Sequence, residues 1–430
     1  MKHPRRARLW SQALPVLLAL APACSDDEPA DPDALLGEAT NCGGYELEPC
    51  DVVEPACRER IAEIAACQWG GPGTPPLLPQ VSTLTESEYR ASLTTDANAE
   101  ADVEQLGTFD DVLVLLGLAD PADASVEASV DRSADAIAAF YDFTSKTITV
   151  VDHGEEVDLA SADATLLHEL IHAQQDAAHD LAGVLDDTLP TTDALTSARV
   201  LFEGEAQFQQ TLFEVGLARI PIDASSFERG LDSVRRSAQD DLFMGPSVLF
   251  TTLQFLPYTY GPEWMYRLWL NGGSAGIQSQ YQKVPTNLLG VLGAAWSKPA
   301  PKALLTAFPV ANIFYTGATP AEGSELIPVG TDRLGAWTVY VAARLAGEEG
   351  LAEDLALGWR GDQLDVYQLD AGGNAGRWRL QFDSEAHADA FGQLLSKNPQ
   401  ITARTQGKTV VGVVSQGAKP EWLFALIAGD

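Results

Sequence analysis

The chain has 430 residues, of which 46% are hydrophobic and 20% are charged, so it is long and apolar enough to form globular domains with full cores. Its formal net charge of −34 argues against an extended basic surface, and therefore against nucleic acid as a partner. In chain order, the sequence divides into four expected regions, which are residues 1–23, 24–79, 80–300 and 301–430.

Residues 1–23 have the features of an export signal. A basic start is followed by an apolar run from Leu14 to Leu20, which is too short to span a bilayer, and then by small residues. The segment Leu20-Ala21-Pro22-Ala23-Cys24 resembles a bacterial lipobox. The resemblance implies a lipid on Cys24 and an exported lipoprotein anchored to a membrane of the bacterial cell envelope. Simple secretion with an unmodified or paired Cys24 is the alternative.

Residues 24–79 hold the remaining cysteines. They form an even cluster, which in an exported chain predicts two disulfides, although the sequence does not choose their pairing. A metal site built from these cysteines is the alternative interpretation. The cluster consists of Cys42, Cys50, Cys57 and Cys67. The Pro- and Asp-rich stretch before it, SDDEPADPD, predicts an extended tether.

Residues 80–300 predict a mainly helical body with a small strand hairpin. Apolar residues at helical spacing occur around Leu84–Leu93 and again around Val103–Leu118. Residues 138–152 predict two short strands around the polar turn Thr144-Ser145-Lys146. The next helix is expected to start at Ser161, a suitable N-cap residue, and to direct its leucines toward a core.

This helix contains the motif HELIH, formed by His168, Glu169, His172 and the two residues between. Residues four apart on a helix lie on one face, so both imidazoles can converge on one ion, and zinc accepts neutral histidine nitrogens. Glu169 lies about 100° further round, where it cannot easily be a ligand. A hydrolase needs this arrangement, because zinc lowers the pKa of a water molecule and a nearby carboxylate takes the proton. The motif therefore predicts a zinc site with Glu169 as the general base.

A third ligand is expected from a second helix, spanning roughly Thr192–Leu217, which contains the segment FEGEA. Glu203 and Glu205 are about 200° apart on this helix, so at most one of them faces the metal. His179 is an unsuitable ligand, because it would lie about 10 Å further along the first helix.

HELIH followed by FEGEA resembles the gluzincins, the zinc peptidases whose third ligand is a glutamate on a helix, and the resemblance implies Glu203 as that ligand. Gly204 would allow the ligand helix to approach the metal closely. Gln207 stands where several gluzincins have an acidic residue that holds a histidine. The segment PYTYG resembles the YxKG segment of the membrane alanyl aminopeptidases, which implies Tyr258 as an oxyanion donor, with Tyr260 in the place of the lysine. The zincin resemblance also implies that an edge strand beside the metal helix pairs with the substrate backbone.

Residues 301–430 predict a small α+β unit packed on the zincin-like body. Within it, Arg360-Gly361-Asp362 is expected to form the turn into a strand. The expected strands are Leu364–Leu369, Trp378–Phe382 and Val410–Val414, and the expected helices are near Thr331–Ala346, Glu385–Ser396 and Glu421–Ile427.

Together, these features predict an α+β protein resembling a group of bacterial gluzincin-like lipoproteins. The expected function is that of an exported zinc metallopeptidase, with one Zn²⁺ held by His168, His172 and Glu203 and a peptide or protein as substrate. Two alternatives stay open. The first is a zincin-fold lipoprotein without turnover that acts as a binding or structural module. The second is a zinc hydrolase with a substrate other than a peptide.

Overall fold

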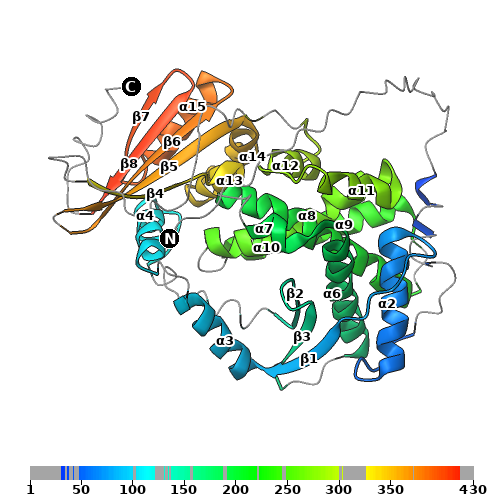
Figure 1. Ribbon diagram of the computed structural model, residues 1–430. Helices are drawn as coiled ribbons and strands as arrows, with labels where there is room; N and C mark the ends of the chain where they lie inside the picture. Colours follow the sequence, from blue (N-terminus) through cyan, green and yellow to red (C-terminus); the bar gives the residue numbers. More distant parts are fainter. Residues whose placement is uncertain are drawn as a thin grey trace, which may run out of the picture.

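The structure is a computed structural model of the chain, and it combines helices with two separate β-sheets (Figure 1). The expected α+β class is therefore correct. The described residues are 31–33, 36–37, 42, 48–99, 103–121, 130, 134, 137–154, 158–186, 191–219, 222–244, 248–299, 303, 326–370 and 372–416. The expected export signal, the tether up to residue 30, Cys24 and the helix expected at Glu421–Ile427 lie outside them.

A group of packed helices forms the centre of the molecule (Figure 1). Two of them, α6 and α8, pack directly against each other and carry the residues expected to bind metal. The helices of this body are α2 (Pro55–Gly70), α6 (Leu159–His179), α7 (Leu181–Asp186), α8 (Thr192–Leu217), α9 (Ala224–Met244), α10 (Val248–Leu270), α11 (Gly273–Tyr281) and α12 (Leu289–Ala295).

The starts of α6 and α8 follow from side-chain caps. Helix α8 has the expected bounds, and the Thr191 hydroxyl accepts a hydrogen bond from the Ala194 N–H. Helix α6 starts earlier than expected. Its N-cap is Asp158, whose carboxylate accepts the Ser161 N–H at 3.1 Å, so the expectation of Ser161 as N-cap was wrong. A carboxylate at this position also interacts favourably with the helix dipole.

A three-stranded sheet lies beside α6, with strand order β1-β3-β2. The hairpin of β2 (Ala139–Asp142) and β3 (Thr147–Asp152) is the one the sequence predicts, and β2 is an edge strand that contacts α6. Strand β1 (Gln80–Thr85) pairs with β3 in parallel. The first expected helix therefore begins only at Glu86, as α3 (Glu86–Ala99), because Thr85 and Glu88 cap its start reciprocally.

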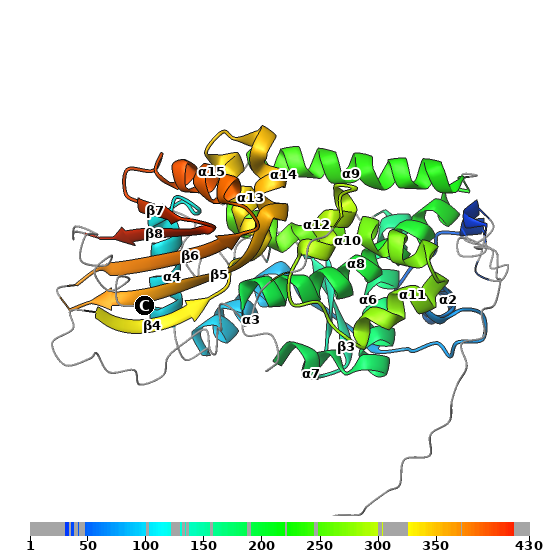
Figure 2. The same cartoon turned by 90° about the horizontal axis from the view of Figure 1, so that it is seen from above.

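The C-terminal unit contains a five-stranded antiparallel sheet, in the order β4-β5-β6-β8-β7. Its elements are β4 (Leu326–Asp332), α13 (Gly335–Leu345), α14 (Glu349–Gly358), β5 (Trp359–Leu369), β6 (Asn374–Phe382), α15 (Glu385–Leu395), β7 (Thr402–Gln406) and β8 (Thr409–Ser415). Helix α4 (Val103–Leu115), from the segment before the hairpin, packs against three of these strands. The unit therefore combines the C-terminal segment with a helix that precedes α6 in the sequence (Figures 1 and 2).

Two details of this unit differ from the expectations. The helix expected at Thr331–Ala346 starts at Gly335, and Thr331 belongs to β4. Arg360, Gly361 and Asp362 are in strand β5 itself, after the strand has begun at Trp359. The Asp362 carboxylate is fully buried and accepts hydrogen bonds from the backbone at Leu334 and Gly335 and from two tryptophans. The tripeptide is a core element of the sheet.

Two disulfides hold the segment before the small sheet. They are Cys42–Cys67 and Cys50–Cys57, the pairing that the sequence left open. The second disulfide contacts α6, where the buried Asp163 accepts the Cys50 N–H at 2.9 Å. Among the described residues, no helix has the length and apolar character needed to cross a membrane.

Candidate metal centre

Three potential metal ligands meet where α6 packs on α8. Both imidazoles point their Nε2 atom at the same carboxylate oxygen of Glu203, at 3.3 Å from His168 and 3.2 Å from His172. The three ligand atoms lie within 4.8 Å of one another, so one metal ion can contact all of them. The structure thus brings together the residues that the sequence predicted as ligands.

Each imidazole is oriented by a glutamine on its other nitrogen. Gln175 Oε1 lies 2.8 Å from Nδ1 of His172, and Gln210 Oε1 lies 3.1 Å from Nδ1 of His168. Both amides are fixed in this orientation, because their nitrogens donate elsewhere. Gln175 donates to the Phe202 carbonyl and to Glu205, and Gln210 donates to Glu214. An amide oxygen only accepts, so both Nδ1 atoms carry hydrogen and both Nε2 atoms can offer a lone pair to a metal.

Behind Gln175 lies a buried hydrogen-bond network centred on Glu205. Its carboxylate accepts from Gln175, from the Tyr281 hydroxyl and from Gln278. Burial raises the pKa of Glu205 to about 7, although these hydrogen bonds favour the charged form.

As the helical geometry predicts, Glu203 faces the histidines and Glu205 faces away from them. His179 belongs to this network, since it binds Gln278 at 2.8 Å and stacks on Tyr281.

The charges of the three ligands depend on one another. Burial alone would lower the pKa of His172, but the Glu203 carboxylate raises it to about 9. Burial alone would raise the pKa of Glu203, but His172 and His168 hold it well below its usual range. In the absence of a metal, a positive charge is therefore stabilised between these side chains. A bound metal cation would meet the same electrostatic requirement.

Glu169 is buried next to the ligands, between α6 and the edge strand β2. Burial raises its pKa, while His168 and His172 oppose the rise, as does the Tyr141 backbone on β2. The carboxyl group can therefore take up a proton more readily than an exposed glutamate does. This is the property that a general base near pH 7 needs.

Tyr258 on α10 lies beside His168 and Glu203. Its ring is stacked on that of His168, with 6.0 Å between the centroids. Burial, and after it the Glu203 carboxylate, raise the Tyr258 pKa well above its usual value. The phenol therefore keeps its proton at neutral pH and is available as a hydrogen-bond donor beside the metal ligands.

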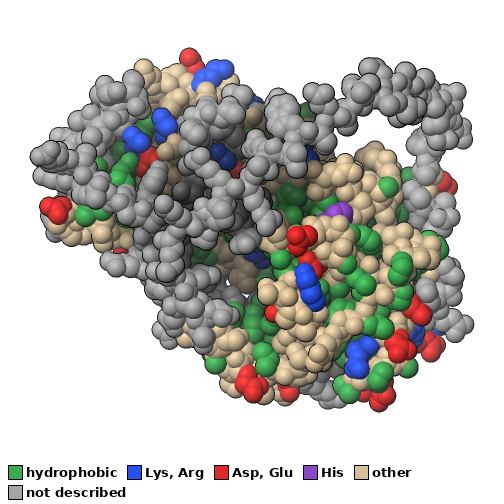
Figure 3. All heavy atoms as spheres, viewed as in Figure 1, with side chains coloured by type: hydrophobic (Ala, Val, Ile, Leu, Met, Phe, Trp, Pro, Cys, Tyr) green, Lys and Arg blue, Asp and Glu red, His purple; other side chains and the backbone are tan. Residues whose placement is uncertain are grey.

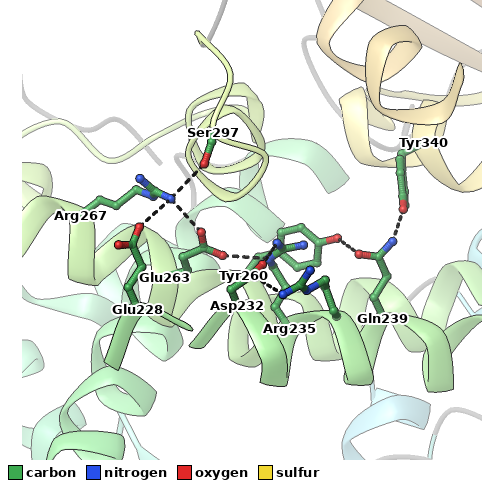
Figure 4. A network of polar contacts seen from close by, with 10 residues as sticks. Glu228, Asp232, Arg235, Gln239, Tyr260, Glu263, Arg267, Ser297 and Tyr340 are labelled. Carbon is green, nitrogen blue, oxygen red and sulfur yellow. Dashed lines mark hydrogen bonds and ion pairs between the residues drawn. The ribbon is translucent and has the colours of Figure 1, made fainter. Parts of the chain in front are cut away.

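Tyr260, two residues later, points to a different part of the molecule (Figure 4). Its hydroxyl donates to Gln239 Oε1 at 2.9 Å, and Arg235 lies over its ring. Arg235 is paired with Glu263 at 2.8 Å, and Gln239 continues the network to Tyr340 of α13. Tyr260 is therefore part of a buried polar network between α9, α10 and α13, and it does not take the place of a catalytic lysine.

The close approach of α8 and α10 explains why Tyr258 reaches Glu203. A Cβ atom on Gly204 would lie 2.7 Å from the Cα of Gly261, so the two helix backbones touch at this pair of glycines. Gly204 follows Glu203, and Gly261 is one turn from Tyr258. We expected Gly204 to bring α8 close to the metal, whereas in the structure it brings α10 close to α8.

Sequence reasoning missed the residues that orient the ligands. Gln207, the position suggested by the gluzincin pattern, lines a neighbouring cavity, and the bond to His168 comes from Gln210 instead. Helical spacing could have indicated both glutamines. Gln175 is three residues after His172, and Gln210 is seven residues, or about two turns, after Glu203.

A second group with metal-binding residue types lies at the start of α6 and consists of Cys50, Cys57 and Asp163. Both sulfur atoms are joined in a disulfide, so they cannot act as thiolate ligands.

Comparison of the chain with protein families, with curated proteins and with solved structures gives no match. The functional argument therefore depends on the site itself.

Proposed function

We propose that the protein is a zinc-dependent peptidase with a zincin-like catalytic body. The observation that carries the proposal is the pair of Nε2 atoms that face one Glu203 oxygen at 3.2 and 3.3 Å. In a tetrahedral site with bonds of about 2.0–2.1 Å, ligand atoms lie roughly 3.3–3.4 Å apart. Two imidazoles and one carboxylate are also the ligand set of known catalytic zinc sites, which leave a position open.

Zinc bound there would supply a Lewis acid that polarises a peptide carbonyl and makes a water molecule more acidic. Glu169 would be the proton acceptor for that water, because its carboxyl group is buried beside the three potential ligands. Tyr258 donates a hydrogen bond to the oxygen on which negative charge develops. The edge strand β2 is the element that an extended peptide would pair with.

The same proposal covers the location of the protein. The export signal in residues 1–23 and the lipobox-like segment ending at Cys24 support an exported protein anchored through a lipid on Cys24. On the face shown in Figure 3, the Lys and Arg side chains of the described residues are scattered and form no continuous patch. The expectation of no nucleic-acid partner depends on the net charge of −34.

The ligand assignment is tested by measuring the zinc content of the purified protein. We expect one zinc ion per chain, and a reduction of at least tenfold in zinc affinity for Glu203→Ala, because one of three ligands is removed. Glu63→Ala, at an exposed glutamate on α2, is the control, and it should keep the ion. Wild-type zinc content in Glu203→Ala would show that the ligand assignment is wrong.

The mechanism is tested with Glu169→Gln. This variant should bind zinc normally and lose peptide hydrolysis by about 10²-fold or more, because the proton acceptor is gone. Hydrolysis of a peptide library, followed by mass spectrometry, gives the readout. Unchanged turnover would remove Glu169 from the mechanism. Zinc binding by a wild type that cleaves no peptide would favour the alternative of a binding module without turnover.

A further inference from the structure

A cavity of about 280 Å³ lies between α8, α9 and α10, next to the candidate metal centre. Its walls are mainly apolar side chains from the end of α8, the following turn and the first half of α9. These are Val215, Ile222, Phe227, Leu231 and Val234. In Figure 2, α9 runs along one edge of the molecule, and it packs on α10.

The cavity shares residues with the metal centre. Tyr258, whose ring is stacked on His168, and Gln207, one helical turn after Glu203, both line it. Glu214, also in the wall, accepts the hydrogen bond from Gln210 that fixes the orientation of Gln210 toward His168. Residues 207, 211 and 214 continue the face of α8 that carries Glu203, so the cavity extends away from the ligand by roughly 6–16 Å.

Size and chemistry limit what can bind there. The volume is just below the roughly 300–1,000 Å³ of pockets that enclose whole small-molecule ligands, so one amino-acid side chain is a better fit. Glu214 is the charged residue of the wall, and it is exposed at the rim. The interior therefore favours an apolar occupant over a charged one.

We propose that this cavity is a specificity pocket that binds a large aliphatic or aromatic side chain of a peptide, next to the bond that is cleaved. The proposal rests on the proposed peptidase function, because the cavity can select a substrate side chain only if the metal centre acts on peptides. It adds the substrate class, which is a peptide with a large apolar residue within two positions of the cleaved bond.

Gly230 on α9 makes a specific test possible. It lines the cavity, and a Cβ atom added to it would meet nothing within 4 Å, so the backbone at this position leaves room for a side chain to begin. Gly230→Leu therefore puts an apolar side chain beside the pocket where the substrate would bind. Gly230→Ala also replaces the glycine in the helix, but its single methyl group leaves the cavity open. Gly350→Leu, on α14, is the matched control at another open position.

Binding is measured separately from catalysis. Blocked hexapeptides that carry Leu, Phe, Ser, Asp or Lys at one position are titrated into the zinc-loaded Glu169→Gln protein, and the dissociation constants are determined by calorimetry. We expect Leu and Phe peptides to bind about tenfold to a hundredfold more tightly than Ser and Asp peptides, because the pocket removes the side chain from water. Gly230→Leu in this background should reduce the preference to less than about twofold, whereas Gly230→Ala and Gly350→Leu should keep it.

The proposal is overturned if no peptide binds, if the Lys peptide binds more tightly than the Leu and Phe peptides, or if Gly230→Leu leaves the apolar preference unchanged. A preference for Lys would identify Glu214 as the specificity residue. Failure of the peptidase function would look different. The protein would still bind apolar peptides preferentially, and Gly230→Leu would still remove this preference, but the wild-type protein would cleave none of the preferred peptides.

Discussion

At the scale of single residues, the distinctive feature of the candidate metal centre is that neutral amides orient both histidines. A carboxylate in this position would make the imidazole more basic and a stronger ligand, whereas an amide oxygen fixes the ring and its protonation with less effect on its electron density. Gln175 does this for His172, and its own amide is held by Phe202 and Glu205. Zinc affinity should therefore depend on residues that never touch the metal.

Gln175→Ala tests this dependence. The variant should bind zinc about 10–100-fold more weakly, because His172 loses the partner that keeps its Nε2 lone pair toward the ion. Competition with a chromophoric chelator measures the affinity. Gln174→Ala is the matched control, because the neighbouring Gln174 is also buried but donates to the Pro75 carbonyl. Equal zinc affinity for the wild type and both variants would contradict the assigned role of Gln175.

At the scale of elements, the crossing of α8 and α10 decides how the site is assembled. The two helices carry Glu203 and Tyr258, and each has a glycine at the point of closest approach. A glycine inside a helix costs about 1 kcal/mol relative to alanine, so a structural reason is expected at such a position. Here the reason is contact between the backbones, which places the phenol beside the ligand carboxylate.

Gly204→Ala should therefore destabilise the protein, although alanine favours helix formation. The added Cβ would lie 2.7 Å from the Gly261 Cα, and separating the helices should cost about 1–3 kcal/mol, more than the gain in helix propensity. Urea unfolding measures the stability, and peptide turnover should fall as Tyr258 moves away from Glu203. Gly230→Ala, on an open face of α9, should be neutral or stabilising. A Gly204→Ala protein as stable as wild type would rule out close packing at this crossing.

At the scale of the whole molecule, the C-terminal unit holds the start of the helix that carries Glu203. Asp332 at the end of β4 accepts the Thr192 N–H at 2.9 Å and the Thr192 hydroxyl at 2.6 Å. The Arg333 carbonyl accepts the Asp193 N–H at 3.0 Å. Two backbone N–H groups of the first turn of α8 are thus satisfied by residues about 140 positions later. The largest buried hydrophobic cluster also joins α8 and α10 to this unit.

This junction should make stability depend on pH. Burial raises the pKa of Asp332 from 3.8 to about 6, against the hydrogen bonds from Thr192. Between these two values the folded state holds a proton that the unfolded state has lost, so stability falls as pH rises, by up to about 3 kcal/mol. Asn does not titrate. The stability of Asp332→Asn relative to wild type should therefore improve from pH 4 to pH 7, as measured by thermal unfolding.

Asp383 provides a control of opposite sign. Burial raises its pKa, but His387 and Arg360 outweigh burial and lower it overall. Its stabilising contribution is present above the unfolded pKa and is lost as pH falls through the folded one. Relative to wild type, Asp383→Asn should therefore become less stable as pH rises through the acid range. The same trend with pH in both variants would contradict the role of Asp332 at the junction.

The sequence alone determined the features that depend on neighbours along the chain. Helical periodicity predicted α8 with its correct bounds, the turn residues predicted the β2–β3 hairpin, and the HELIH spacing placed both histidines on one face. The gluzincin resemblance then indicated Glu203, which lies 31 residues from His172. These signals are local or carried by a short motif, so they can be read without knowing how the chain folds back.

Only the tertiary structure decided what surrounds the motif. The partners of the histidines, the direction of Tyr260, the cavity beside Tyr258 and the junction at Asp332 all depend on contacts between segments far apart in sequence. Such contacts follow from how helices cross and which faces they bury, and helical periodicity identifies a buried face without naming its partner. The two glycines at the α8–α10 crossing illustrate this, because the need for a glycine at either position is visible only when the two helices are packed together.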